Sequence, residues 1–258
     1  MPVISDDFDD TILSNAWTFV GPTGTSSGLV QSGSESFLTL TTSPGDHDVW
    51  TANRSASALQ SVDNTDFDVV ARLLSTPTEQ FQMQGILVRE DVDSWIRFDL
   101  QSNGSELHAF ASVTLDGIPG TRIDVPVIEG TASFLRVTRS GDFWSFLYSN
   151  DGANWTLAGS FQQALSVTEI GPFAGSTTSA PGFTAEVDYF FDAASPPPTE
   201  DGLPLPLIAS GPHVLTGLVA EASVLSHEAS YSLSDGTFAF TITADAISVG
   251  LRLANDGV

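Results

Sequence analysis

The stretch GDFWSFLYSNDGANW, residues 141–155, decides the fold class. An Asp-Gly step between two aromatic-rich runs is a strong hairpin signal, and here it falls in the turn Asn150-Asp151-Gly152. Alternation divides the first strand between two faces, one with Phe143, Ser145 and Leu147 and the other with Trp144, Phe146 and Tyr148. Both faces carry large apolar groups. We therefore expect a strand within a two-layer sandwich, or a strand with one face covered by a ligand.

Similar strand patterns occur along most of the chain, and helical patterning is nearly absent. They read FLTLTT (37–42), FDVVARLL (67–74), FQMQGILV (81–88), SWIRFDL (94–100), LHAFASV (107–113), SFLRVTR (133–139) and FTAEVDYFF (183–191). Turn sequences such as Ser-Asn-Gly and Asp-Gly separate them at short spacing. Short strands with such turns predict an all-β sandwich or barrel.

The proline-rich segment ASPPPTEDGLPLPLIASGP (194–212) predicts a stiff linker, because proline is excluded from strand and helix interiors. It bounds a first domain at residues 1–193. Residues 213–258 return to a strand pattern but are few for an independent core. This tail either docks on the first domain or opens a second one.

The charge balance narrows the partners. Against 32 acidic residues the chain has eight basic ones, all arginine, for a net charge of −24. Such a surface repels nucleic acid and anionic lipid, and suits calcium or simple solubility. There are no cysteines, so disulfides are excluded. No apolar run reaches the ~20 residues of a membrane helix, so we expect no membrane insertion, and residues 1–15 lack the pattern of a classical signal peptide.

A series of phrases in fixed order resembles one family. These are DDFDD with NAWTFV, HDVWTANRSA, FQMQGILVREDVDSWIRFDLQSNG, LRVTRSGDFWSFLYSNDGANW and IGPFAGSTTSAPGFTAEVDYFF. Together, over roughly residues 5 to 195, they resemble the bacterial concanavalin A-like lectin/glucanase modules of large secreted glycan-handling proteins. The resemblance implies a jelly-roll β-sandwich of two curved antiparallel sheets, a frequent structural calcium, attachment to other domains, and an extracellular or cell-surface location. DGTFAFTITAD in the tail is similar to the opening of a laminin-G-like module.

Acidic residues at both ends of the first domain suggest where calcium would bind, because calcium takes six to eight oxygen ligands. In the fold that the resemblance implies, the first and last strands run side by side, so carboxylates from both ends can share an ion. The match to the family's calcium-site strand favours Asp188, with Asp7 and the Gly45-Asp46 segment as partners. The alternative is a set of solvated acidic turns.

A sugar site is expected on one face of the sheet, because planar polar side chains and aromatic faces hold sugars. We expect the polar sets of neighbouring strands to lie on one exposed, concave side, with the loop HDVWTANRSA as a wall. The candidate ligand-binding residues are Gln82, Gln84, Trp95, Arg97, Asp99, His47, Asp48, Trp50, Asn53 and Arg54. The alternative is a solvated face with an Arg–Asp pair.

Catalysis finds little support in the sequence. Glycosidases of this fold carry a Glu-x-Asp-x-x-Glu strand motif, because cleavage needs two carboxyl groups about 5 to 10 Å apart, and this chain has no such motif. We expect a non-catalytic carbohydrate-binding module of an extracellular multimodular protein, with a polysaccharide as partner. The alternatives are a structural or adhesive spacer stiffened by calcium, and a glycan hydrolase or lyase.

Overall fold

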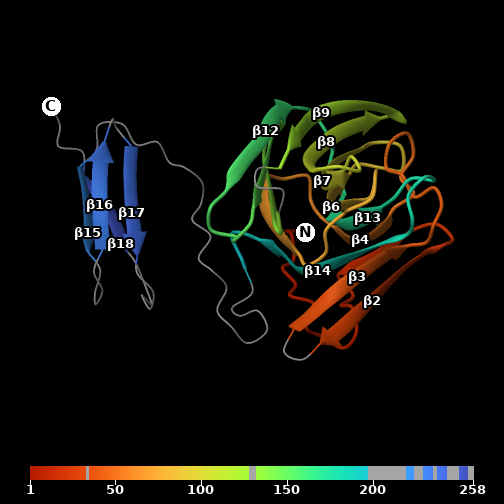
Figure 1. Cartoon of the computed structure of the whole chain (residues 1–258). Helices are drawn as coiled ribbons and strands as arrows, with labels where there is room; N and C mark the ends of the chain where they lie inside the picture. The colour runs from red at the N-terminus through yellow and green to blue at the C-terminus, as the bar shows by residue number, and fades with distance from the viewer. Residues whose placement is uncertain are drawn as a thin grey trace. The chain divides into compact units, whose positions relative to one another are not determined.

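The structure, a computed structural model, describes residues 1–32, 35–127 and 132–196 together with four strands between residues 219 and 254 (Figure 1). All elements of the described residues are strands, which confirms the all-β prediction. The chain divides into two compact units, Met1–Ile208 and Ala209–Val258. Among the described residues no helix is long and apolar enough to cross a membrane.

Two antiparallel sheets of seven strands form the first unit, and this confirms the predicted sandwich. The first sheet has the order β1 (Trp17–Val20), β4 (Ala56–Ser61), β13 (Glu169–Gly175), β6 (Met83–Arg89), β7 (Trp95–Ser102), β8 (Leu107–Leu115) and β9 (Ile118–Pro126). The second sheet has the order β12 (Thr156–Gln162), β11 (Phe143–Ser149), β10 (Phe134–Ser140), β5 (Phe67–Leu73), β14 (Phe183–Asp192), β3 (Glu35–Thr42) and β2 (Thr25–Ser32).

The hairpin around Asp151 forms as its alternation predicts. Trp144, Phe146 and Tyr148 of β11 lie in the core between the sheets, whereas Phe143 on the opposite face is 52% exposed. The Asp151 carboxylate accepts hydrogen bonds from the backbone N–H groups of Ala153 and Asn154. These bonds, with one from the Asn154 side chain, hold the pKa of Asp151 well below its usual range. The turn is therefore fixed by local polar contacts and the strand by packing.

A core cluster fills the space between the sheets. From the first sheet it takes alternate residues of β6 and β7, namely Ile86, Val88, Ile96, Phe98 and Leu100. Phe98 also packs against Trp144 and Phe146 of the second sheet, with ring centroids 5.9 and 5.6 Å apart. The intervening residues of β7 must therefore point to the outer face of the first sheet.

The N-terminal segment is tied to the last strand of the sandwich. Asp6 forms an isolated bridge with Phe190 on β14, and its carboxylate accepts a 2.7 Å hydrogen bond from the Trp17 indole. Ser5 Oγ donates to the carbonyl of Ser195 at 2.6 Å. Both ends of the sandwich are thus held by residues before position 196.

We expect a chain that ends after Ser195 to stay folded, because every strand of both sheets precedes that residue. Circular dichroism and a melting curve of the shortened chain test this. Loss of the β-type spectrum would mean that the tail completes the first sandwich.

The tail has two antiparallel strand pairs, β15 (Val219–Ser223) with β18 (Gly250–Ala254) and β16 (Ala229–Ser234) with β17 (Thr237–Ile242). The predicted proline-rich linker at 194–212 lies outside the described residues from position 197 onward. The boundaries at residues 193 and 213 stay predictions.

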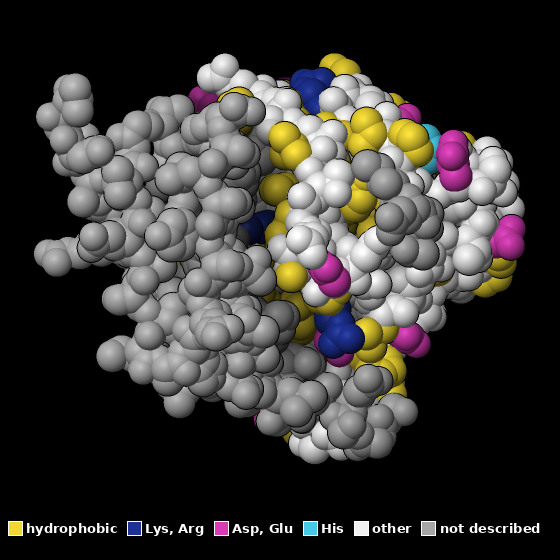
Figure 2. All heavy atoms as spheres, turned by 60° about the vertical axis from the view of Figure 1, so that its left-hand side comes forward, with side chains coloured by type: hydrophobic (Ala, Val, Ile, Leu, Met, Phe, Trp, Pro, Cys, Tyr) yellow, Lys and Arg dark blue, Asp and Glu magenta, His cyan; other side chains and the backbone are white. Residues whose placement is uncertain are grey.

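Charge is mixed on the described part of the face in Figure 2. On the face of the molecule in Figure 2, acidic and arginine side chains occur singly among apolar and neutral ones. The described atoms on that view show no large patch of one charge sign.

Candidate functional site

Five side chains of β7 and β8 form the candidate site, called here the β7 site: Trp95, Arg97, Asp99, Phe110 and Ser112. The strand register places them on one face, because Arg97 pairs with Ser112 and Asp99 pairs with Phe110. This face is opposite to the one that Phe98 presents to the core. All five side chains are buried even though they lie on the outer side of a sheet.

The loop at residues 43–55 covers this outer face. Val49 is fully buried in a second apolar cluster with Trp95, Leu87 and Phe173. The carbonyl of Trp50 accepts a 2.9 Å hydrogen bond from Thr114 Oγ1, and its ring lies 6.4 Å from that of Phe110. Thr114 and Phe110 flank Ser112 on β8, so Trp50 crosses the strand above Ser112.

Arg97 has weak partners for a buried cation. Its guanidinium carbon lies 4.6 Å from the ring centroid of Phe110, and one nitrogen donates to Gln101 Oε1 at 3.0 Å. A second nitrogen contacts the thioether of Met83, which is a weak acceptor. Its Nε lies 3.6 Å from Asp99 Oδ1, which is too far for a good hydrogen bond.

Asp99 is fully buried, and neither of its oxygens has a hydrogen-bond partner among the described residues. Burial raises the pKa of this carboxyl to about 7, with repulsion from Asp48 and Asp124 adding to the shift and Arg97 opposing it. A Cβ atom built on Gly85, the cross-strand neighbour, would lie 2.8 Å from Asp99 Cβ. Glycine is therefore the residue that fits opposite this carboxylate.

Five unpartnered polar atoms lie together at this site, and others, such as Arg89 Nε and Trp155 Nε1, lie apart from it. Among the described residues, the buried atoms without a hydrogen-bond partner include Trp95 Nε1, Arg97 Nε, both Asp99 oxygens and Ser112 Oγ. Buried polar groups in proteins are nearly always hydrogen-bonded, so an exception needs an explanation. These five atoms have no hydrogen-bond partner among the described residues, so they are free to bond a group from outside them.

Two predicted ligand residues lie elsewhere. Gln84 pairs with Leu100, which lies in the core, so Gln84 also faces the second sheet. Its amide oxygen accepts from Ser75 Oγ and its amide nitrogen donates to the Ser75 carbonyl. Gln82 precedes β6 and bonds the backbone of Thr78 and Glu79. Placing them beside Arg97 and Asp99 was wrong, because the register pairs odd-numbered residues of β6 with odd-numbered residues of β7.

The predicted loop residues divide into two groups. Two of them act on the β7 site. The charge of Asp48 raises the pKa of Asp99, and the ring of Trp50 contacts Phe110. The other three hold the loop in shape: His47 contacts Ser43 and the Arg54 carbonyl, Asn53 accepts from Ser55, and Arg54 pairs with Asp46. Exposure of Arg97 in the free protein was also expected, and this is wrong, since Arg97 is 3% exposed.

Neighbouring residues that the sequence reading missed extend the site toward solvent. Gln101 pairs with His108, and the His108 ring bonds Asp124 Oδ1 at 2.6 Å. Phe110 and Ser112 were also missed. The alternation of LHAFASV contained the signal, because the Ser-Asn-Gly turn makes that segment the cross-strand partner of SWIRFDL.

The predicted calcium ligands do not come together as a cation site. Asp188 is 1% exposed, and its carboxylate forms an ion pair with the Arg72 guanidinium at 2.6 Å. Asp46 forms an ion pair with Arg54. Burial and the neighbouring Asp9 raise the pKa of Asp7. Within the described residues, no three His, Asp or Glu side chains are grouped so as to hold a metal ion. Calcium also takes backbone carbonyl and water oxygens, so a structural calcium stays a prediction of the sequence.

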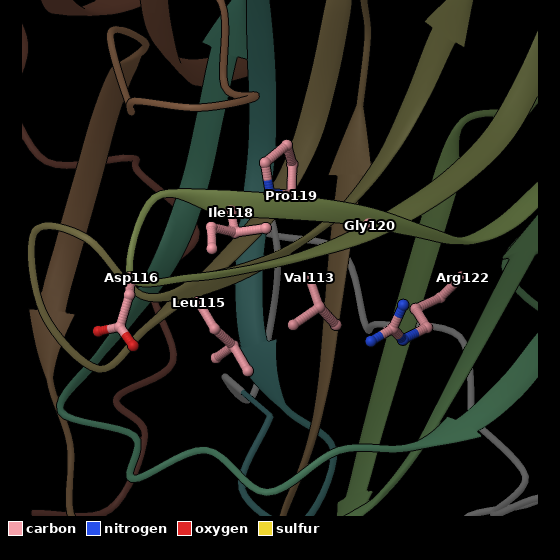
Figure 3. A pocket seen from close by; sticks show the side chains of 7 residues that line it. All are labelled: Val113, Leu115, Asp116, Ile118, Pro119, Gly120 and Arg122. Carbon is pink, nitrogen blue, oxygen red and sulfur yellow. The ribbon is translucent and has the colours of Figure 1, made fainter.

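A separate pocket of about 440 Å³ lies at the β8–β9 hairpin (Figure 3). Its walls are Val113, Leu115, Asp116, Ile118, Pro119, Gly120 and Arg122. Ile118 is 74% exposed, and Arg122 donates to Gln163. The pocket offers an open apolar surface, whereas the β7 site offers unpartnered polar atoms.

The first unit matches one protein family. The family model described as a protein of unknown function (DUF1349) matches residues 30–191. No match was found among curated proteins.

Solved structures share the fold at low identity. The GH43 protein BlXynB of Bacillus licheniformis is 22% identical with a TM-score of 0.58, and the match covers 72% of this chain and 38% of that one. A xylan β-1,4-xylosidase of Bacillus halodurans is 16% identical with a TM-score of 0.51, over 72% of this chain and 38% of that one. The CBM2 module of the evolved Dit of Lactobacillus casei BL23 phage J-1 is 12% identical with a TM-score of 0.52, over 73% of this chain and 94% of the module. The chain thus spans well under half of BlXynB and of the xylosidase, and these likenesses show the sandwich fold.

Proposed function

We propose that this chain, which belongs to the DUF1349 family of proteins of unknown function, is a non-catalytic glycan-binding module whose ligand enters the β7 site beneath Trp50. The observation that supports this proposal most is the group of five buried polar atoms on Trp95, Arg97, Asp99 and Ser112 that have no hydrogen-bond partner among the described residues. Leaving such atoms unsatisfied costs free energy. A ligand that bonds them recovers that free energy.

A sugar fits the kinds of atoms present. Indole and guanidinium N–H groups donate, carboxylate oxygens accept, and the hydroxyl of Ser112 does both. Trp50 and Phe110 lie beside these atoms and offer aromatic faces against which a sugar ring can pack. The structural neighbours include a GH43 protein and a xylosidase, and they support the same class of ligand.

The proposal extends to the setting of the module. The matched chains of BlXynB and of the xylosidase are much longer than this sandwich, which supports a module within a larger protein. An extracellular or cell-surface location is part of the proposal and rests on the sequence resemblance alone. A spacer module without sugar affinity is the alternative, and a screen against a polysaccharide array separates the two.

Glycoside hydrolysis is a second candidate, favoured by the raised pKa of Asp99. A carboxyl that stays protonated near neutral pH can serve as a general acid. Hydrolysis also needs a second carboxylate about 5 to 10 Å away, and Asp48 and Asp124 are the carboxylates that act on Asp99 electrostatically. Release of reducing sugar by the protein, abolished in Asp99→Asn, would support hydrolysis over binding.

Trp50→Ala is the direct test of the binding proposal. We expect about tenfold weaker binding of any glycan found in the screen, because an aromatic face contributes about 1 kcal/mol or more and 1.4 kcal/mol is a factor of ten. Titration calorimetry measures the affinity. Trp155→Ala is the matched control, since Trp155 is also half-buried but packs on the second sheet. Equal losses in both variants, or unchanged binding in Trp50→Ala, would refute the site.

A further inference from the structure

We infer that the β7 site takes an uncharged, polyhydroxylated sugar ring and rejects both uronate and ammonium-bearing sugars. This inference rests on the proposed function and names its ligand class. It follows from which atoms lack partners and which charges surround them.

The unpartnered atoms require a ligand that both donates and accepts. Asp99 presents two acceptor oxygens, whereas Trp95 Nε1 and Arg97 Nε present donors. A hydroxyl can serve either kind of atom. A carboxylate on the sugar has no proton for the ionised form of Asp99, and an ammonium group has no lone pair for Trp95 or Arg97.

The charges around the site oppose an anion. The cation of Arg97 already has the ionised form of Asp99 at 3.6 Å, which offsets part of its attraction for an anion. Asp48 and Asp124 both act on Asp99 as like charges. Further out, His108 is held between Asp124 and Glu106, at 2.6 and 3.4 Å. A uronate would meet an excess of negative charge on a protein whose net charge is −24.

The same surroundings also oppose the binding of ammonium-bearing sugars, even though the carboxylates around the site carry negative charge. Desolvating an ammonium group requires several acceptors around it, and the acceptors within the buried site are those of Asp99 and Ser112. The guanidinium of Arg97 occupies the position next to Asp99 and would repel the second cation.

Access to these atoms depends on Trp50. Its backbone is fixed to Thr114 by the 2.9 Å hydrogen bond, so the side chain is the part that can move. A rotation of the ring away from Phe110 would uncover Ser112 and leave the indole face beside the incoming sugar.

The test compares three matched β-1,4-linked oligomers, of glucose, glucosamine and glucuronate, together with a general polysaccharide array. Affinities are measured at pH 7 at two salt concentrations. We expect uncharged glycans to bind at least tenfold more tightly than charged ones of the same linkage. Their affinity should change little with salt, because screening acts on charge–charge attraction.

The variant Ser112→Ala is a second test of the β7 site. Its hydroxyl has no partner among the described residues, so removing it should leave the melting temperature unchanged or raise it, while uncharged glycans bind about three- to tenfold more weakly. Ser160→Ala, on β12 of the second sheet, is the matched control and should bind normally.

The outcomes separate the two proposals. If no glycan on the array binds, the proposed function fails. If uronate or ammonium polymers bind as tightly as uncharged ones, the inference fails while the glycan-binding function stands. If Ser112→Ala binds uncharged glycans normally, the ligand lies elsewhere and the β7 site is refuted.

Discussion

Replacing Trp144 with alanine is expected to lower the free energy of unfolding by about 3 to 5 kcal/mol, the usual range for a large aromatic removed from a core. Its side chain is fully buried, and its ring lies 5.8 Å from Phe67 and 5.9 Å from Phe98. The indole N–H donates to the Gln163 carbonyl at 2.8 Å, so the substitution also leaves that acceptor without its partner. The cation of Arg139, 5.2 Å from the ring, would lose its aromatic contact as well.

Chemical denaturation of Trp144→Ala measures this loss. Phe143→Ala is the matched control, because Phe143 is the neighbouring residue on the same strand and is half-exposed. We expect the control to change stability by no more than about 0.5 kcal/mol. If Trp144→Ala instead abolishes glycan binding at unchanged stability, the functional face belongs to the second sheet.

The contrast between Trp144 and Phe143 shows why the fold could be predicted from sequence. Alternation and the Asn150-Asp151-Gly152 turn are local properties, and the structure reproduces both in the β11–β12 hairpin. The even-numbered side chains enter the core and the odd-numbered ones face outward. A sandwich follows once many such strands occur in one chain.

The candidate site could be predicted only in part, because it depends on register and on a loop. Polarity suggested that Gln84 belongs beside Arg97, but polar side chains also occur in cores when a neighbour satisfies them, as Ser75 does for Gln84. The register between β6 and β7 decides the face, and polarity does not. Likewise, no periodicity shows that the loop with Val49 and Trp50 folds over Arg97 and buries it.

Asp99 connects the stability of the sandwich with its proposed ligand, and Asp99→Asn is expected to have the second large effect. The pKa of this carboxyl is raised from 3.8 to about 7 in the folded protein. The folded form therefore binds the proton more tightly than the unfolded chain does. The stabilisation from the neutral carboxyl is complete below about pH 4 and is lost as the pH rises through about 7.

Each unit of pKa shift corresponds to about 1.4 kcal/mol, so at pH 8 the ionised carboxyl costs the folded protein about 4 kcal/mol. Asparagine resembles the neutral carboxyl in shape and does not ionise. Asp99→Asn should therefore match the wild type at pH 4 and exceed its stability by up to about 4 kcal/mol at pH 8. The attraction to Arg97 is already included in the raised pKa, since Arg97 is one of its causes. Denaturation curves at the two pH values measure the difference, and equal stability at pH 8 would contradict a buried, unpartnered carboxylate.

The same carboxylate should report the arrival of a sugar. Hydroxyls that donate to Asp99 favour its ionised form and lower its pKa, so glycan binding near pH 7 is expected to release a fraction of a proton. Calorimetry in buffers with different ionisation enthalpies detects that release, and Asp99→Asn removes it while weakening binding about tenfold. Glycan binding without proton release in the wild type would place the sugar away from Asp99, even if the stability prediction held. The ionised Asp99 lowers the stability of the folded protein, and the proposed ligand would supply the hydrogen bonds that it lacks. A binding role of this kind would explain why an aspartate occupies this buried position.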